Sequence, residues 1–145
     1  MPQRDDRQNN PPTDPLIGRW TYRSFISNPD IAVDFGAIEF GRGELLVEYS
    51  APGLFIGRLT FSDDYQFRLQ GTAFPSDPPT VRFQGVGDAE KSLNQVYDYF
   101  GSLMPCWPHG HDQRPTIVGS VIRSTAHNGD EAPAGVVSAF IALKR

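Results

Sequence analysis

The chain has 145 residues, of which 39% are apolar and 21% are charged, and its net charge is −4. This length and composition are typical of one globular domain that is large enough to bury a core. They exclude a general nucleic-acid-binding protein, because such proteins cluster Lys and Arg against phosphate groups, whereas the thirteen basic residues here are dispersed.

Cysteine content and the N-terminal segment favour a cytoplasmic location. Cys106 is the only cysteine, so the chain cannot form an intramolecular disulfide, as is typical of proteins in reducing compartments. Residues 1–15 are polar and rich in proline, which predicts a disordered arm and not a secretory signal. No apolar run reaches the ~18 residues that a membrane helix needs. We expect a cytoplasmic protein with one domain over residues 16–145 and no membrane or nucleic-acid partner.

From residue 16 onward, apolar and polar residues alternate with a period of two. This period predicts strands that have one buried face and one solvent-exposed face. The faces expected to be buried carry Trp20, Tyr22 and Ser24 in the first run, Leu45, Val47 and Tyr49 in the second, and Tyr65, Phe67 and Leu69 in a later one.

Turn-forming residues separate the runs, which predicts an antiparallel sheet. The segments GRG at 41–43, SDD at 62–64 and PSDPP at 75–79 all lie between candidate strands. Further candidate strands cover residues 37–40, 53–61, 80–86, 116–125 and 135–145. A meander of about eight strands hides its edges most simply by closing on itself. The predicted fold is therefore all-β, a small antiparallel up-and-down β-barrel.

Residues 88–100 fit two structures. Apolar residues from Ala89 to Phe100 have helical spacing, with Asp88 and Gly101 in capping positions. The aromatic and β-branched residues of 95–104 favour a strand instead. We expect a short helical turn near 89–93, followed by a strand from about 95 to 104.

The last two candidate strands are apolar on both faces. In residues 116–124, Ile117 and Val121 lie on one face, and Val118 and Ile122 lie on the other. Residues 136–143 have the same character. The barrel interior covers one apolar face of these strands, and the other face also has to be shielded from water. We therefore expect a homo-oligomer that forms through strands 116–143. The alternative is that the N-terminal arm folds back over this face.

The first strand begins with Gly18-x-Trp20, and basic residues, Arg123 and Lys144, occur in the last two strands. This arrangement resembles the calycin group, the lipocalins and avidins. In that group the indole of a Gly-x-Trp packs under a basic side chain from a late strand and closes the barrel floor. The resemblance implies a calycin-like barrel with Trp20 as the floor plug and Arg123 as its candidate partner.

The segment PCWPHGHDQRP at 105–115 contains the chemistry-bearing residues Cys106, His109 and His111. His-x-His on a strand places both imidazoles on one face, as in metal-binding cupins, and Asp112 could be a third ligand. The flanking prolines and Gly110 favour a loop instead. We therefore expect no metal site, and a stiff loop whose Trp107 folds over a mouth of the barrel.

Tyrosines and one arginine suggest a ligand cavity. A barrel interior lined with phenols and one cation suits a small, partly apolar molecule. A barrel filled entirely by these side chains is the alternative. The expected ligand-binding residues are Trp20, Tyr22, Tyr49, Tyr65, Tyr97, Tyr99, Trp107 and Arg123.

Four functions remain open. The sequence favours a small-molecule-binding protein without a cofactor. The first alternative is a barrel enzyme of isomerase or cyclase type, similar to allene oxide cyclase, in which tyrosines and Arg123 steer protons or charge. The others are a cupin-like metal-dependent enzyme using His109 and His111, and a structural subunit of an oligomer.

Overall fold

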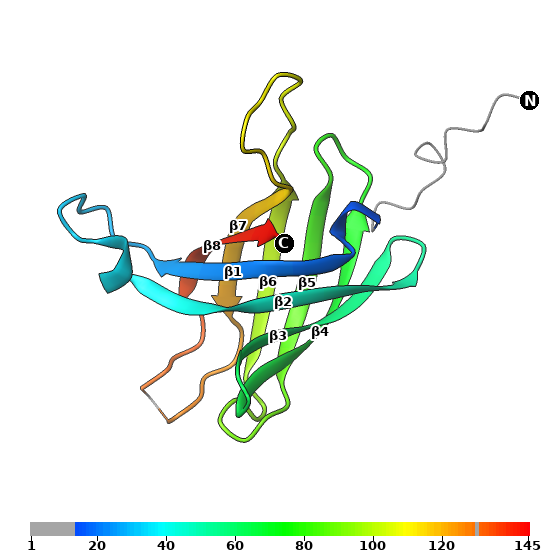
Figure 1. Cartoon of the computed structure of the whole chain (residues 1–145). Coiled ribbons are helices and arrows are strands. Elements are labelled where there is room, and N and C mark those ends of the chain that lie inside the picture. The colour runs from blue at the N-terminus through cyan, green and yellow to red at the C-terminus, as the bar shows by residue number, and fades with distance from the viewer. Residues whose placement is uncertain (1–13, 130) are drawn as a thin grey trace, which may run out of the picture.

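The computed structural model describes residues 14–129 and 131–145, and eight antiparallel strands in this part of the chain form one closed barrel (Figure 1). Each strand pairs with the next one along the chain, and β8 pairs with β1. The strands are β1 (Gly18–Ile26), β2 (Glu39–Ala51), β3 (Leu54–Ser62), β4 (Tyr65–Phe74), β5 (Thr80–Gly87), β6 (Val96–Leu103), β7 (Thr116–Arg123) and β8 (Val137–Lys144). The predicted all-β, up-and-down barrel is confirmed.

The barrel interior is built from the alternation seen in the sequence. Trp20, Tyr22 and Ser24 of β1 are buried, while the residues between them are exposed. The same alternation buries Tyr97 and Tyr99 of β6. Because successive side chains of a strand point to opposite faces, each strand gives one set of residues to a single core.

The two ends of the barrel differ in the segments that meet there. The start of β1 and the loop between β6 and β7 lie at one end, which we call the Trp20 end (Figure 1). The loops 27–38, 88–95 and 124–136 lie at the opposite end, which we call the Arg123 end.

The segment 88–100 forms turns up to residue 95 and a strand from Val96 onward. β6 begins at Val96, within one residue of the predicted start, so this prediction is confirmed. The preceding residues form tight turns and no helix, with Ser92 N bonded to Ala89 O and Gln95 N bonded to Ser92 O. Asn94 adopts a left-handed φ of 65°, which interrupts any helical continuation.

The N-terminal segment is described only from residue 14. Asp14–Leu16 forms a short 3-10 turn, and Leu16 is buried in the barrel. The expected disordered arm otherwise falls on residues 1–13, outside the described residues. In the part of the chain that the structure describes, no helix is long and apolar enough to cross a membrane.

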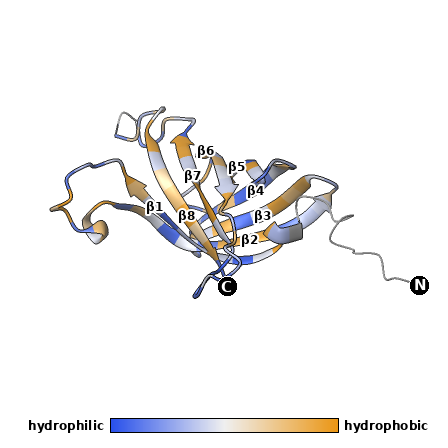
Figure 2. Cartoon of the chain, turned by 90° about the horizontal axis from the view of Figure 1, so that it is seen from above, coloured by the Kyte–Doolittle hydropathy of each residue, from blue (hydrophilic) through white to orange (hydrophobic). Residues whose placement is uncertain are grey.

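The outer face of β7 and β8 is apolar, as the sequence predicts. Hydrophobic stretches run along both strands (Figure 2). Val118, Ile122, Val137 and Leu143 point outward and are each between 37% and 49% exposed. Every outward position of these two strands carries an uncharged residue: Val118, Ser120, Ile122, Val137, Ala139, Ile141 and Leu143.

Candidate functional site

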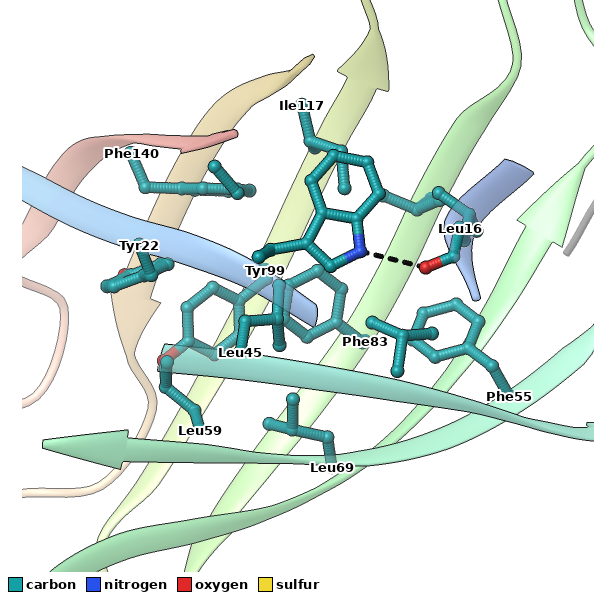
Figure 3. Close-up of a cluster of buried hydrophobic side chains, with 14 of the residues drawn as sticks. Leu16, Tyr22, Leu45, Phe55, Leu59, Leu69, Phe83, Tyr99, Ile117 and Phe140 are labelled. Atoms are coloured by element: carbon teal, nitrogen blue, oxygen red, sulfur yellow. Dashed lines mark hydrogen bonds between the residues drawn. The ribbon is translucent and has the colours of Figure 1, made fainter. Parts of the chain in front are cut away.

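Trp20 closes one end of the barrel. Its side chain is fully buried, and its indole Nε1 donates to Leu16 O at 2.8 Å (Figure 3). Lys144 Nζ lies 5.8 Å from the ring centroid and donates to Pro15 O. Gly18 has a φ of 135°, which side chains rarely adopt, and a Cβ there would lie 3.2 Å from Lys144 Cε. The floor-plug prediction for Trp20 agrees with this placement.

The basic partner of Trp20 is Lys144, and the prediction of Arg123 for this role is wrong. β8 runs antiparallel to β1, so its last residues lie beside the first residues of β1, and Lys144 pairs in register with Trp20. Arg123 ends β7 and therefore lies at the opposite end of the barrel.

Side chains fill the Trp20 end. Leu45, Phe55, Leu59 and Leu69 are each no more than 4% exposed and belong with Trp20 to one cluster of buried side chains (Figure 3). A void of about 10 Å³, no larger than one water molecule requires, is lined by Leu16, Leu45, Val47, Phe55, Val81, Phe83 and Ile117. A void of this size is too small for a ligand.

The Arg123 end contains a cavity of about 330 Å³. Tyr22 and Tyr99 separate it from the filled half, and Phe83 stacks on Tyr99 with centroids 4.5 Å apart. No Asp or Glu lines the cavity among the described residues. The lining residues are Tyr22, Ser24, Phe40, Gly41, Arg42, Phe61, Tyr65, Phe67, Tyr97, Tyr99, Val121, Arg123 and His127.

A chain of hydrogen bonds links three residues of the cavity wall. Arg123 Nε donates to the Tyr97 hydroxyl at 3.2 Å, and the same oxygen lies 3.2 Å from His127 Nε2. Since the hydroxyl accepts from the guanidinium, its own hydrogen is available to His127 Nε2. Burial, together with the charge of Arg123, lowers the pKa of His127 below 6.5, which favours the neutral imidazole.

Two phenols at the bottom of the cavity are held in the neutral form. Burial raises the pKa of Tyr22 to about 12, against a smaller opposite effect of hydrogen bonding to Ser24 and Tyr99. Burial also raises the pKa of Tyr99 well above 10. Both hydroxyls therefore remain protonated around neutral pH and can donate hydrogen bonds to a bound molecule.

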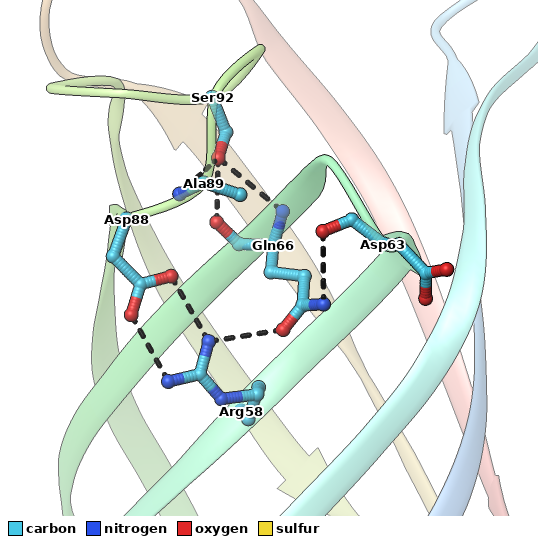
Figure 4. A network of polar contacts seen from close by, with 6 residues as sticks. All are labelled: Arg58, Asp63, Gln66, Asp88, Ala89 and Ser92. Atoms are coloured by element: carbon cyan, nitrogen blue, oxygen red, sulfur yellow. Dashed lines mark hydrogen bonds and ion pairs between the residues drawn. The ribbon is translucent and has the colours of Figure 1, made fainter.

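A polar network fixes the loop 88–95 beside the cavity (Figure 4). Arg58 forms a bidentate ion pair with Asp88, at 2.9 and 3.0 Å. The buried Ser92 hydroxyl donates to Gln66 O at 2.7 Å. The anchored loop places Gln95 Oε1 2.6 Å from the Tyr65 hydroxyl, so the orientation of this phenol is set by the loop.

Three of the expected ligand-binding residues lie away from the cavity: Trp20, which plugs the opposite end, Tyr49 and Trp107. Tyr49 has the inward parity of β2 but lies near the end of this long strand and is 51% exposed. Trp107 is 72% exposed, and its loop lies at the Trp20 end, so it does not cover the cavity. The predicted lid is therefore wrong. Gln113 braces this loop through two hydrogen bonds with the Trp107 backbone.

The histidines of the same loop show no metal site. His109, His111 and Cys106 are exposed. Over residues 14–129 and 131–145, no three residues among His, Cys, Asp and Glu come together in a group that could hold a metal ion.

Sequence reasoning placed four tyrosines and Arg123 near the cavity and missed several neighbours. His127 lies in a hairpin whose backbone pairs His127 with Ala132, and the hairpin brings the imidazole to Tyr97. Phe40 lies after a register shift between β1 and β2, so simple alternation does not place its ring beside Arg123. Asn-Gly at 128–129 predicts the hairpin beside His127, but the sequence pattern does not predict that His127 reaches Tyr97 or that Phe40 reaches Arg123.

We compared the chain with protein-family models, curated proteins and solved structures, and none of them matches it.

Proposed function

We propose that this protein binds a small, partly apolar molecule in the cavity at the Arg123 end. The observation that carries the proposal is a cavity of about 330 Å³ whose walls combine aromatic rings with hydroxyl, guanidinium and imidazole groups. Ligand sites in proteins have this size and combine apolar and aromatic surface with oriented polar groups. A barrel filled entirely by side chains would have no such space.

The barrel floor supports the resemblance to calycins. Trp20 follows Gly18 at the start of β1, and Lys144 of the last strand lies over its ring. In the calycin group this arrangement closes one end and leaves the other for a ligand. The position of the cavity at the opposite end agrees with that division.

Two measurements test the binding proposal. Native mass spectrometry of the purified protein should detect a co-purified molecule, and the uncharged fluorophore N-phenylnaphthylamine should bind and brighten. Val121→Phe places a ring in the cavity and should abolish both signals, because Val121 is buried in its wall. Thr60→Phe, on the outer face of β3, is the matched control and should retain them. Equal signals from both variants would refute binding at this site.

A second candidate function is isomerisation or cyclisation of the bound molecule. The hydrogen-bonded Tyr97–His127 pair favours it, because these groups can move a proton at the cavity wall. Such a rearrangement conserves the atoms of its substrate and needs no co-reactant. Recovery of a co-purified molecule as a structural isomer after incubation would support catalysis, and recovery of the unchanged molecule would support binding alone.

We also infer that two copies pack through the outer face of β7 and β8. The uncharged outward residues of these adjacent strands form one apolar surface, and a symmetric dimer brings such a surface against itself. Light scattering at micromolar concentration should give a particle larger than 16.1 kDa. Ile122→Lys should give the monomer, and a monomeric wild-type protein would refute this interface.

A further inference from the structure

Arg123 is a buried cation with no carboxylate partner among the described residues. Its side chain is 9% exposed. The ion pairs of the described residues join Arg19 and Arg145 to Glu44, Arg42 to Glu39, Arg58 to Asp88 and Lys91 to Asp64. Buried arginines are almost always paired, because removing the charge from water is costly.

The guanidinium group is held in place by aromatic rings. Its Cζ lies 5.5 Å from the centroid of Phe40 and 5.9 Å from that of Tyr97. Of its five N–H groups, Nε–H donates to the Tyr97 hydroxyl and one on Nη1 donates to Pro133 O. The remaining N–H groups have no acceptor among the described residues, so the guanidinium is oriented and still has donors for a further partner.

The rest of the cavity does not supply that partner. Phe61, Phe67 and Val121 give it apolar walls, and the described lining contains no carboxylate. Arg42, the other arginine of the lining, already forms a bidentate pair with Glu39 at 2.9 and 3.0 Å. Within the described lining, Arg123 is therefore the one positive charge without a carboxylate partner, and apolar side chains form part of the wall beside it.

We infer that Arg123 binds the carboxylate of the ligand, so that the molecule held in the cavity is a small monocarboxylic acid whose apolar body lies against Phe61 and Phe67. This inference rests on the proposed binding function. Planar carboxylates match the donor geometry of a guanidinium. A phosphate ester of higher charge would need a second unpaired cation, which the described lining does not provide.

The volume of the cavity limits the size of the acid. About 330 Å³ equals the volume of roughly ten water molecules in the liquid. Single-ring aromatic acids and medium-chain fatty acids have this size, whereas long-chain lipids do not. Cinnamate and octanoate are therefore suitable probes, and palmitate is the probe that should be excluded.

Matched pairs of acid and amide test the inference. Calorimetry should show that the wild-type protein binds cinnamate and octanoate at least about tenfold more tightly than cinnamamide and octanamide, since a charge-assisted bidentate contact is lost in the amides. Arg123→Gln should remove this preference. Arg82→Gln is the matched control, because Arg82 also stacks on an aromatic ring, Phe100 at 5.0 Å, but on the outer face of the barrel.

The outcomes separate this inference from the proposed binding function. If acids and amides bind equally well, the carboxylate contact is refuted and binding in the cavity stands. If neither binds but Val121→Phe still abolishes fluorophore binding, the carboxylate contact again fails alone. If Val121→Phe and Thr60→Phe behave alike, both proposals fail. Should Arg123→Gln not fold, the preference of the wild-type protein for acids over amides decides the matter by itself.

Discussion

The guanidinium of Arg123 both donates a hydrogen bond to Tyr97 and lies beside its ring. The Nε to hydroxyl distance is 3.2 Å, and Cζ is 5.9 Å from the ring centroid. The same hydroxyl contacts His127 Nε2 at 3.2 Å, so β6, β7 and the loop 124–136 meet at one oxygen atom. The phenol thus orients the buried cation without neutralising it.

Removing that oxygen should destabilise the barrel. Tyr97→Phe keeps the ring but leaves Arg123 Nε and His127 Nε2 without this partner, and we expect the free energy of unfolding to fall by about 1–3 kcal/mol. Tyr49→Phe is the control, because Tyr49 is half exposed and should change stability by less than about 0.5 kcal/mol. Urea unfolding measures both, and equal effects would contradict a structural role for the Tyr97 hydroxyl.

The plug at the other end should depend on the indole more than on the cation above it. Trp20→Ala removes a fully buried ring and should cost about 3–5 kcal/mol of unfolding free energy. Lys144→Gln removes a partly exposed cation 5.8 Å from that ring and should cost about 0.5–1 kcal/mol. Thermal unfolding of both variants checks this order, and a reversed order would show that the floor is held by charge.

His127 should make the protein less stable in mild acid. Its pKa is lowered by burial and by Arg123, whereas in the unfolded chain it titrates near 6.5. Between these two values the unfolded state binds more protons, so stability is lost as the pH falls from 6.5 to the folded-state pKa. The other titratable groups lining the cavity beside it are Arg42 and the phenols of Tyr22, Tyr65, Tyr97 and Tyr99.

Urea unfolding between about pH 7 and about pH 5 measures this loss. The carboxyl groups with lowered pKa values, Glu39, Asp64 and Asp88, change stability mainly below this range, because their pKa values are lowered by hydrogen bonds to Arg42, to Ser62 and Lys91, and to Arg58. His127→Gln should flatten the pH dependence, and an unchanged slope would assign it to another group.

Alkaline conditions should destabilise the barrel through its buried phenols. The pKa of Tyr22 is raised to about 12 and that of Tyr99 well above 10, in both cases by burial. The stability that these neutral phenols confer is complete below pH 10 and is lost as the pH rises from 10 toward the folded-state values. Tyr22→Phe should reduce the loss measured between about pH 9 and pH 11, and an equal loss would place its cause elsewhere.

The strands and the inward-facing residues could be predicted from the sequence because both follow from a period of two. Trp20, Tyr22, Tyr97 and Tyr99 were assigned to a buried face, and all four are buried. Tyr49 is exposed although it lies on the inward-facing side of β2. Alternation predicts which face of the sheet a residue occupies, but not its position along the barrel axis. β2 continues past the packed core, so an inward parity there still leaves the ring in solvent.

The two ends of the barrel were harder to assign. In an up-and-down barrel, successive loops alternate between the two ends. If the number of strands before a loop is uncertain by one, the end of the barrel at which that loop lies cannot be assigned from the sequence. The loop 105–115 was predicted to cover the mouth of the ligand cavity, yet it lies at the Trp20 end. The same uncertainty explains why Arg123 was predicted to lie beside Trp20, whereas it lies at the opposite end of the barrel. The placement of His127 depends on the path of a long loop, which no local pattern encodes.

A crystal structure of the complex with cinnamate tests the central claim most directly. We predict electron density for the acid inside the cavity, with its carboxylate oxygens within hydrogen-bond distance of the Arg123 guanidinium and its ring against Phe61 and Phe67. Density for the acid outside the barrel, or inside it with the carboxylate directed away from Arg123, would contradict the claim.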